Sequence, residues 1–175
     1  MGHYWEAGPQ AVSLNELCRR IGISKPGLYR EFGDEDALMT EVLRHYRTVE
    51  VEPLLAMLER SAWQSVIAGL LDATTTGHGA PAGCLFTKFR FAEHRLGPKT
   101  ARSLGQIVAE RRSAFAERFA VAQAAGEAPP ELTRDLAAHY LDTQLSVILM
   151  QMATEEPRVR IRAQGELALG VLVVD

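Results

Sequence analysis

The chain has 175 residues, 47% of them hydrophobic, and its 19 Lys and Arg against 22 Asp and Glu give a formal net charge of −3. This composition excludes a disordered, collagen-like or coiled-coil chain, and it excludes a surface that is basic overall. Two cysteines make no disulfide framework and indicate a reducing compartment. The longest apolar runs are far shorter than the roughly 20 residues of a membrane span, and the first residues lack the pattern of an export signal. We therefore expect a cytoplasmic protein with no membrane contact.

The apolar residues recur with helical spacing, and β-strand patterns are nearly absent. Gly and Pro residues divide the chain into segments that we expect to be helical. These segments are 13–21, 25–32, 35–49, 53–76, 84–95, 98–125, 130–154 and 158–173. Because the segments are short before about residue 50 and long after it, we predict an all-α fold with a small N-terminal domain, 1–48, and a larger helical bundle, 49–175.

Two of the short segments form a recognisable pair. Ser13 and Glu16 make a capping box at the start of the first, and Gly22 suits the left-handed residue that ends it. Ser24 is a good N-cap for the second, whose first turn tolerates Pro26. Two short helices joined by a glycine-containing turn are typical of a helix-turn-helix unit.

Such a helix fits the DNA major groove, which is about 12 Å wide. Hydroxyl groups and cations contact phosphates, and cations also bind guanine. Ser13, Ser24, Lys25, Tyr29 and Arg30 carry these groups. However, capped helix pairs also occur in proteins that bind no DNA, and residues 13–32 carry only four basic against two acidic residues. The spacing alone therefore leaves both interpretations open.

The run from Ser13 to Leu38 resembles the helix-turn-helix of the TetR family of bacterial transcriptional repressors. Its most specific pieces are Gly22-Ile23-Ser24-Lys25, Leu28-Tyr29 with Phe32, and Ala37-Leu38. The family pattern spans roughly residues 4–50, and the remainder is similar in layout to the family's ligand-binding, dimerising domain. The resemblance implies a homodimer that binds double-stranded DNA at a pseudo-palindromic operator. The implied DNA-contacting residues are Ser13, Ser24, Lys25, Gly27, Tyr29 and Arg30.

Three departures from the family pattern weaken the expected DNA affinity. The family has a full first helix under the motif, whereas residues 4–8 supply only its last turn or two, as if it were truncated. Glu35 stands where the family commonly has a phosphate-binding lysine, and Gly27 where a serine or threonine often contacts DNA.

Segment 130–154 carries two apolar stripes. A helix that packs on the core with one face and exposes the other to solvent needs only one such stripe. The stripes are Leu136, Tyr140, Thr143, Val147 and Met150, and Leu141, Leu145, Ile148 and Met152. A symmetric partner would cover the second stripe and complete a four-helix bundle with the last two helices. The predicted dimer interface is Leu141, Leu145, Ile148, Met152, Val159, Ala163, Leu167 and Val171. Alternatively, other helices of the same chain cover it.

The segment that begins with Gly83-Cys84-Leu85 continues with aromatic residues that alternate with Lys and Arg. Its first three residues are similar to those of a large TetR subgroup. Apolar walls with a few polar groups are typical of an effector pocket. The residues predicted to line one are Trp63, Phe86, Phe89, Arg90, Tyr140, Gln144 and Met150. In the alternative, these aromatics are core and Arg90 pairs with an acidic neighbour such as Glu93. Cys84 is expected to be a buried thiol.

We find no catalytic or metal-ligating set, because neither Asp135 with His139 nor Glu93 with His94 supplies three ligands. No phosphate loop or dinucleotide motif occurs, so no cofactor and no enzyme activity are expected. The sequence favours a DNA-binding transcriptional regulator that responds to a ligand, and more specifically a repressor. An unknown small-molecule effector would tilt segment 35–49 and so release the protein from its operator. The alternative is a TetR-like small-molecule-binding or interaction module with weak or lost DNA binding.

Overall fold

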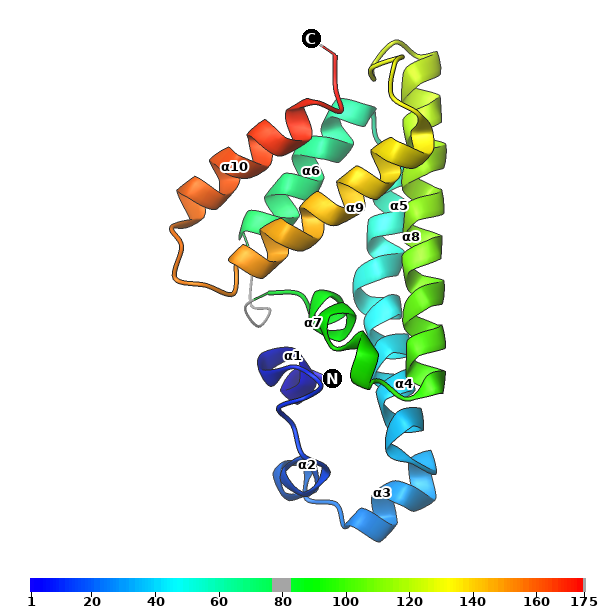
Figure 1. The fold of residues 1–175 in the computed structure, drawn as a ribbon, viewed down its shortest axis with the longest axis vertical. Helices are drawn as coiled ribbons and strands as arrows, with labels where there is room; N and C mark the ends of the chain where they lie inside the picture. Colours follow the sequence, from blue (N-terminus) through cyan, green and yellow to red (C-terminus); the bar gives the residue numbers. More distant parts are fainter. Residues whose placement is uncertain (77–82, 175) are drawn as a thin grey trace.

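The computed structural model describes residues 1–76 and 83–174, and every regular element in these ranges is a helix. The molecule is elongated, with α8 (Pro98–Ala124) running along much of its length and the N-terminal helices at one end (Figure 1). The predicted all-α class is confirmed. Among the described residues, no helix is long and apolar enough to cross a membrane.

The N-terminal part consists of α1 (Gly2–Ala7), α2 (Leu14–Ile21), α3 (Lys25–Phe32) and α4 (Glu35–Tyr46). The last three begin at side-chain caps, where Ser13, Ser24 and Asp34 accept hydrogen bonds from backbone amides. Gly22 ends α2 in the left-handed conformation, with φ of 70°. The local signals in the sequence therefore place these helices correctly.

The chain continues from α4 through a π-helical turn, η1 (Arg47–Val51), into α5 (Glu52–Arg60). It then reverses into α6 (Trp63–Thr76), which lies beside α9 and α10 (Figure 1). The prediction of a single helix over 53–76 is therefore wrong.

The reversal occurs at Ser61 and Ala62, neither of which is a helix-breaking residue. Residues of the α8 region hold it in place. The guanidinium of Arg118 donates to the Ser61 carbonyl at 2.6 Å, and the Glu127 carboxylate accepts from the Trp63 amide at 2.8 Å. Because these contacts are distant in sequence, the local pattern does not reveal the break.

The remaining elements are α7 (Leu85–Phe91), the 3-10 turn η2 (Glu93–Arg95), α9 (Arg134–Gln151) and α10 (Arg158–Gly170). The predicted segment 84–95 is thus a short helix followed by a turn. Segment 130–154 becomes helical only at Arg134, because Thr133 accepts from the Leu136 amide and caps α9 there.

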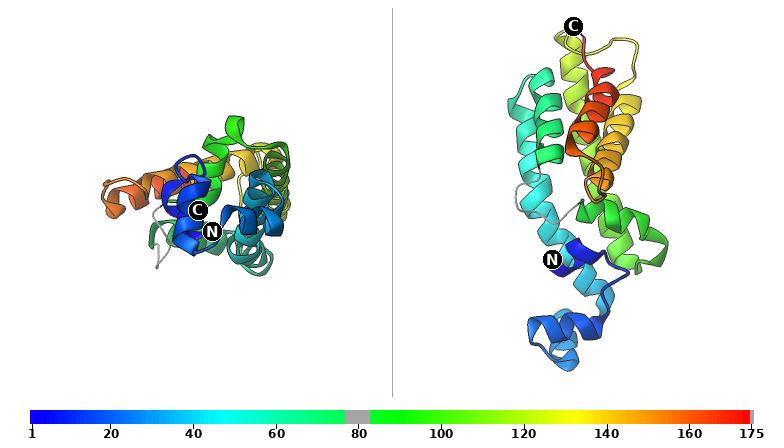
Figure 2. Two further views of the ribbon diagram at one scale, coloured as in Figure 1. Left: turned by 90° about the horizontal axis from the view of Figure 1, so that it is seen from below. Right: turned by 90° about the vertical axis from the view of Figure 1, so that its left-hand side faces the viewer.

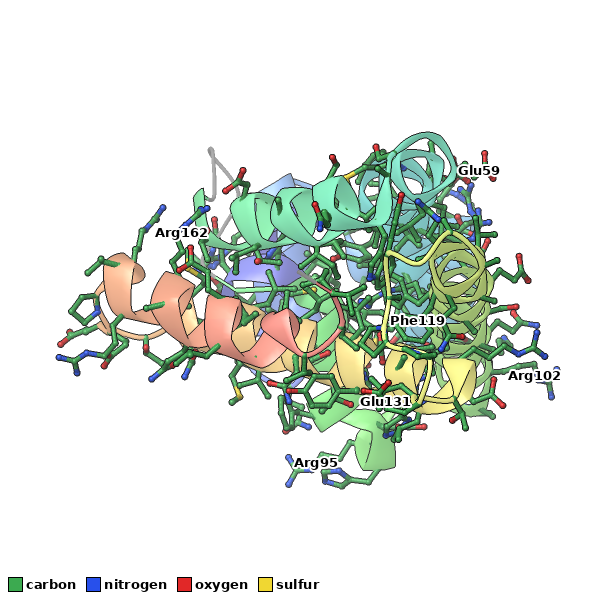
Figure 3. The ribbon with its side chains drawn as sticks, turned by 90° about the horizontal axis from the view of Figure 1, so that it is seen from above. Glu59, Arg95, Arg102, Phe119, Glu131 and Arg162 are labelled. Atoms are coloured by element: carbon green, nitrogen blue, oxygen red, sulfur yellow. The ribbon has the colours of Figure 1, made fainter. Side chains whose placement is uncertain are left out.

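Two hydrophobic clusters fill the molecule. One lies in the bundle of α5, α6, α8, α9 and α10, where Phe119 points between the helices and Glu59 points outward (Figure 3). The other joins the N-terminal helices to α7 and the start of α8, through Tyr4, Leu43, Phe86 and other residues. The side view in Figure 2 shows this part below the bundle. The helix-turn-helix unit therefore packs directly on the helices that follow it.

Candidate nucleic-acid interface and cavity

The outer surface of α3 carries the residues that the sequence singles out. Lys25, Tyr29 and Arg30 are exposed, whereas Leu28 is completely buried and anchors the helix. Gly27 fits closely, since a Cβ there would lie 3.1 Å from the Ser24 hydroxyl oxygen. The six predicted DNA contacts thus lie together around α3 and the start of α2, at the far end of the molecule (Figure 1).

Ion pairs leave two cations available on this surface. Glu16 pairs with both Arg19 and Arg20 at 2.6 Å, and their hydrogen bonds lower the pKa of Glu16 to about 2. Among the described residues, Lys25 and Arg30 make no ion pair. Positive charge that is not already paired is therefore concentrated on α3, where phosphates can reach it.

A side chain of α4 caps α8. The carboxylate of Asp36 accepts the amides of Lys99 and Thr100, both at 2.9 Å, and the Thr100 hydroxyl lies 2.6 Å away. The Lys99 ammonium pairs with Asp34 at 2.8 Å. The start of α8 has no side-chain cap of its own, so these contacts hold it against the start of α4. We call this group of residues the α4–α8 joint: Asp34, Asp36, Gly97, Lys99 and Thr100.

The joint predicts an acid-sensitive contribution to stability. Burial opposes ionisation of Asp36, but the hydrogen bonds from Thr100 and Lys99 outweigh it and lower its pKa below the ordinary 3.8. The carboxylate's contribution is therefore complete above about pH 5 and is lost as the pH falls through the lowered value. We expect Asp36→Asn to cost about 1 kcal/mol of unfolding free energy at pH 7.

Urea titrations of both chains from pH 7 to pH 3 measure this effect. The difference between the wild-type and Asp36→Asn chains should begin to shrink below about pH 4 and disappear as the pH falls through the lowered pKa of Asp36, where the folded wild-type group is protonated as well. A difference that stays constant over this range would contradict the assigned role of the carboxylate.

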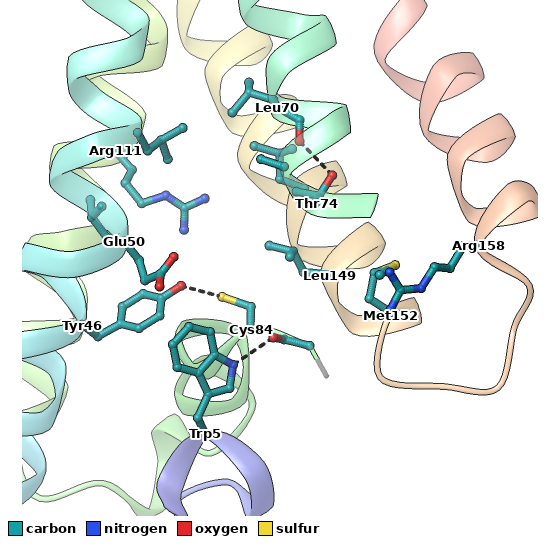
Figure 4. A pocket seen from close by; sticks show the side chains of 15 residues that line it. Trp5, Tyr46, Glu50, Leu70, Thr74, Cys84, Arg111, Leu149, Met152 and Arg158 are labelled. Atoms are coloured by element: carbon teal, nitrogen blue, oxygen red, sulfur yellow. Dashed lines mark hydrogen bonds between the residues drawn. The ribbon is translucent and has the colours of Figure 1, made fainter. Parts of the chain in front are cut away.

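A cavity of about 270 Å³ lies above α1, between α6, η1 and α9 (Figure 4). Its walls are mainly apolar, and its polar groups come from different helices. The apolar side chains include Trp5, Leu54, Leu70, Leu145, Leu149 and Met152, and the polar ones include Tyr46, Glu50, Thr74, Cys84 and Arg111. Apolar walls with few polar groups are the composition of a small-molecule site.

The N-terminal helices α1 and α4 form part of this cavity's wall. Trp5 of α1 donates from its indole nitrogen to the Gly83 carbonyl at 3.0 Å, and its ring meets that of Tyr46 edge to face at 5.4 Å (Figure 4). The Tyr46 hydroxyl lies 3.0 Å from the Cys84 sulfur, and burial and this thiol raise the pKa of Tyr46 well above its usual value. A molecule in the cavity would therefore touch both α1 and the end of α4.

None of the seven residues predicted to line an effector pocket lines this cavity. Phe86 and Phe89 are completely buried in the lower cluster, and the Trp63 indole donates to the Leu172 carbonyl in the upper one. Gln144 is half-buried, and Met150 is exposed on the surface. An aromatic pattern in a sequence indicates burial, and it does not separate core from pocket.

Two polar members of that set, Arg90 and Tyr140, are occupied by contacts within the protein. Arg90 pairs with Asp142 at 2.9 Å rather than with Glu93, and the Tyr140 hydroxyl donates to the Ala168 carbonyl at 2.9 Å. Arg111, Trp5 and Tyr46 line the cavity but are not among the residues predicted from the sequence. Arg111 left a detectable signal, because it interrupts the apolar face of α8 between Ile107 and Phe115.

The predicted dimer interface also needs correction. Leu141, Leu145 and Ile148 are at most 2% exposed, because that stripe of α9 packs inside the chain's own core, and Met152 lines the cavity. Most of the other stripe is exposed, and on the neighbouring α10 the predicted residues Val159, Ala163, Leu167 and Val171 are exposed as well. We call the large exposed side chains of the two helices the α9–α10 patch: Leu136, Val147, Met150, Val159, Leu167 and Val171.

Comparisons with known proteins agree with this architecture. The family model described as "Bacterial regulatory proteins, tetR family" matches residues 4–42. The HTH-type transcriptional repressor BdcR of Escherichia coli (strain K12) is 31% identical over 86 residues, 47% of this chain and 44% of BdcR. The HTH-type transcriptional repressor ComR of the same strain is 26% identical over 144 residues, 79% of this chain and 69% of ComR.

A solved structure extends the likeness over nearly the whole chain. It is that of the TetR family transcriptional regulator CifR, a cysteine mutant complexed with 26-base-pair double-strand operator DNA. The two chains are 26% identical with a TM-score of 0.81, covering 98% of this chain and 91% of CifR. The family model thus matches the helix-turn-helix region, and the chain as a whole is similar in fold to a regulator of the TetR family.

Proposed function

We propose that this chain is a homodimeric transcriptional repressor that binds a pseudo-palindromic operator through α3 and leaves it when a small molecule enters the cavity. The observation that carries the proposal is the exposed surface of α3, with Lys25, Tyr29 and Arg30 at the end of an elongated molecule. An N-terminal recognition helix with cations of this kind suits a DNA major groove.

The relatives support DNA as the partner. The CifR structure, similar over nearly the whole chain, contains operator DNA, and both E. coli relatives are named as transcriptional repressors. A repressor of this kind reads two half-sites about 34–36 Å apart, which requires two copies of α3 related by a twofold axis.

The α9–α10 patch supplies a surface for the second copy. Its two helices lie side by side, joined by the bond from Tyr140 to the Ala168 carbonyl and by one between Gln151 and Gln164 at 2.8 Å. Large apolar side chains gathered on one exposed face favour a protein partner over solvent. Two copies of the patch would form a four-helix interface.

Effector release would follow from the position of the cavity. A bound molecule would contact Arg111 on α8 as well as Trp5 of α1 and Tyr46 of α4, which lie in the same hydrophobic cluster as the helix-turn-helix. The α4–α8 joint connects that helix to the start of α4. The molecule shifts the protein away from DNA only by binding the released conformation more tightly than the DNA-bound one.

Titration of the promoter fragment flanking its own gene with the Lys25→Ala and Arg30→Ala chains tests DNA binding. Each change removes two contacts per dimer, so we expect roughly 100-fold weaker binding and a salt slope that is smaller by about 2 if the contacts are to phosphates. Arg102→Ala, which removes an exposed cation of α8, is the matched control.

The outcomes separate the two functional readings. Binding that neither substitution weakens would refute the assigned interface. Failure of the wild-type chain to bind that promoter or any operator fragment would instead favour the TetR-like small-molecule-binding module with lost DNA binding.

A further inference from the structure

We propose that the cavity binds a small organic anion, an apolar molecule with one carboxylate that pairs with Arg111. This inference rests on the proposed function, because it names the class of the effector. It follows from the charges around the cavity rather than from its shape alone.

Arg111 is a buried cation with few partners. It is 6% exposed, lies on the cavity wall, and its guanidinium carbon is 4.8 Å from the centre of the Phe86 ring (Figure 4). Among the described residues its ion pair is with Asp142, whose Oδ1 is 3.1 Å from Nη2. The Nε of Arg111 and this Oδ1 have no hydrogen-bond partner. A buried guanidinium normally has its donors satisfied.

The partner carboxylate is shared with two further cations. Asp142 is completely buried, and its Oδ2 lies 2.9 Å from Arg90 and 3.3 Å from Arg112. Three guanidinium groups therefore surround one carboxylate, which leaves an excess of two positive charges. Arg90 and Arg112 are partly exposed and reach water, whereas Arg111 is enclosed beside the cavity. The cavity is the side from which a further anion can reach Arg111.

The remaining groups select the rest of the ligand. Leu54, Leu70, Leu145 and Leu149 require an apolar body, and the Tyr46 hydroxyl adds one polar contact. The other ionisable wall residues are Glu50, which is exposed at the rim, and Arg158. Burial raises the pKa of Glu50. Its single carboxylate does not offset the excess of two positive charges around Asp142. A volume of about 270 Å³ limits the ligand to a small molecule.

A carboxylate suits this site better than a neutral group. Guanidinium binds carboxylate through two parallel hydrogen bonds, which fixes the orientation of the ligand as well as its affinity. An ammonium ligand would meet the excess positive charge around Asp142 and should not bind.

Probe molecules of equal shape test the charge requirement on the full chain. Calorimetry at pH 7 would compare benzoate with benzamide and benzylamine, and hexanoate with hexanamide, at up to about 10 mM. We expect at least one carboxylate to bind at least tenfold more tightly than its amide, and no binding of the amine. Equal affinity of acid and amide, preference for the amine, or no binding of either acid would overturn the proposal.

Two substitutions locate the binding group. Arg111→Lys keeps the charge near Asp142 but loses the paired donors, and it should weaken carboxylate binding about tenfold. Arg102→Met removes an exposed cation from the same helix, outside both the cavity wall and the ion pairs of Asp142, and it should leave affinity unchanged. Circular dichroism checks that both variants fold. If the Arg111→Lys chain does not fold, hydrogen exchange of the wild-type chain with and without benzoate is measured instead. Benzoate should then protect the backbone amides around Trp5 and Tyr46. An unchanged affinity in Arg111→Lys, or no such protection, refutes the site.

An operator-release assay with the same probes separates this inference from the proposed function. If an uncharged or cationic probe binds in the cavity and releases DNA, the effector-release function stands and the anion site is wrong. If carboxylates bind through Arg111 without altering DNA affinity, the anion site stands and effector release is wrong.

Discussion

The Leu167→Glu chain is expected to be a folded monomer that no longer binds operator DNA. Leu167 is 80% exposed on α10, so the substitution disturbs no packing within the chain. In a twofold dimer built on the α9–α10 patch, two new carboxylates would enter one apolar interface. Burying unpaired charges costs several kcal/mol, and about 4 kcal/mol weakens dimerisation by roughly 1,000-fold.

Analytical ultracentrifugation and circular dichroism would measure assembly and folding separately. The matched control is Val121→Glu, which places the same charge at a 60% exposed valine on α8, outside the patch. The patch is not the interface if the Leu167→Glu chain remains a dimer, or if both substitutions dissociate it equally.

The helix-turn-helix could be predicted from the sequence because its determinants are local. Ser13 and Ser24 cap the helices that follow them within three residues, and Gly22 supplies the left-handed residue between them. These interactions form within a few residues of each other, so the order of residue types contains the necessary information.

The orientation of α9 could not be predicted in the same way. Both of its stripes have helical spacing, and the sequence does not say which one meets the rest of the chain. In the fold, Leu141, Leu145 and Ile148 pack in the core with α6 and α8, which leaves Val147 and Met150 outside. That choice depends on the packing of helices far apart in sequence.

The cavity depends on the same long-range packing. Its wall combines Trp5, Tyr46 and Arg111, which are separated by tens of residues and meet only when α1, α4 and α8 assemble. The aromatic residues near Phe86 attracted the functional prediction, but they fill the core instead. A cation on an otherwise apolar helix face, as Arg111 is, does lie on the cavity wall.

A substitution at Gly97 is expected to break the α4–α8 joint. A Cβ at this position would lie 2.2 Å from Cγ of Asp36, so in a Gly97→Ala chain the carboxylate must move away from the start of α8. The backbone itself accepts alanine, because φ is −66°. Loss of the hydrogen bonds to the Lys99 and Thr100 amides should lower the free energy of unfolding by about 2 kcal/mol, or roughly 4–8 °C in Tm.

A double-mutant cycle distinguishes this cause from a general effect of the alanine. Asp36→Ala removes the atoms that the new Cβ would strike, and it abolishes the same hydrogen bonds. Gly97→Ala should therefore cost about 2 kcal/mol in the wild-type chain but less than about 0.5 kcal/mol in the Asp36→Ala chain, as measured by urea unfolding. Additive costs would mean that the two residues act independently. A strongly non-additive cycle would identify the contact as the structural connection between α8 and the helix-turn-helix, because only a shared group makes the second substitution harmless.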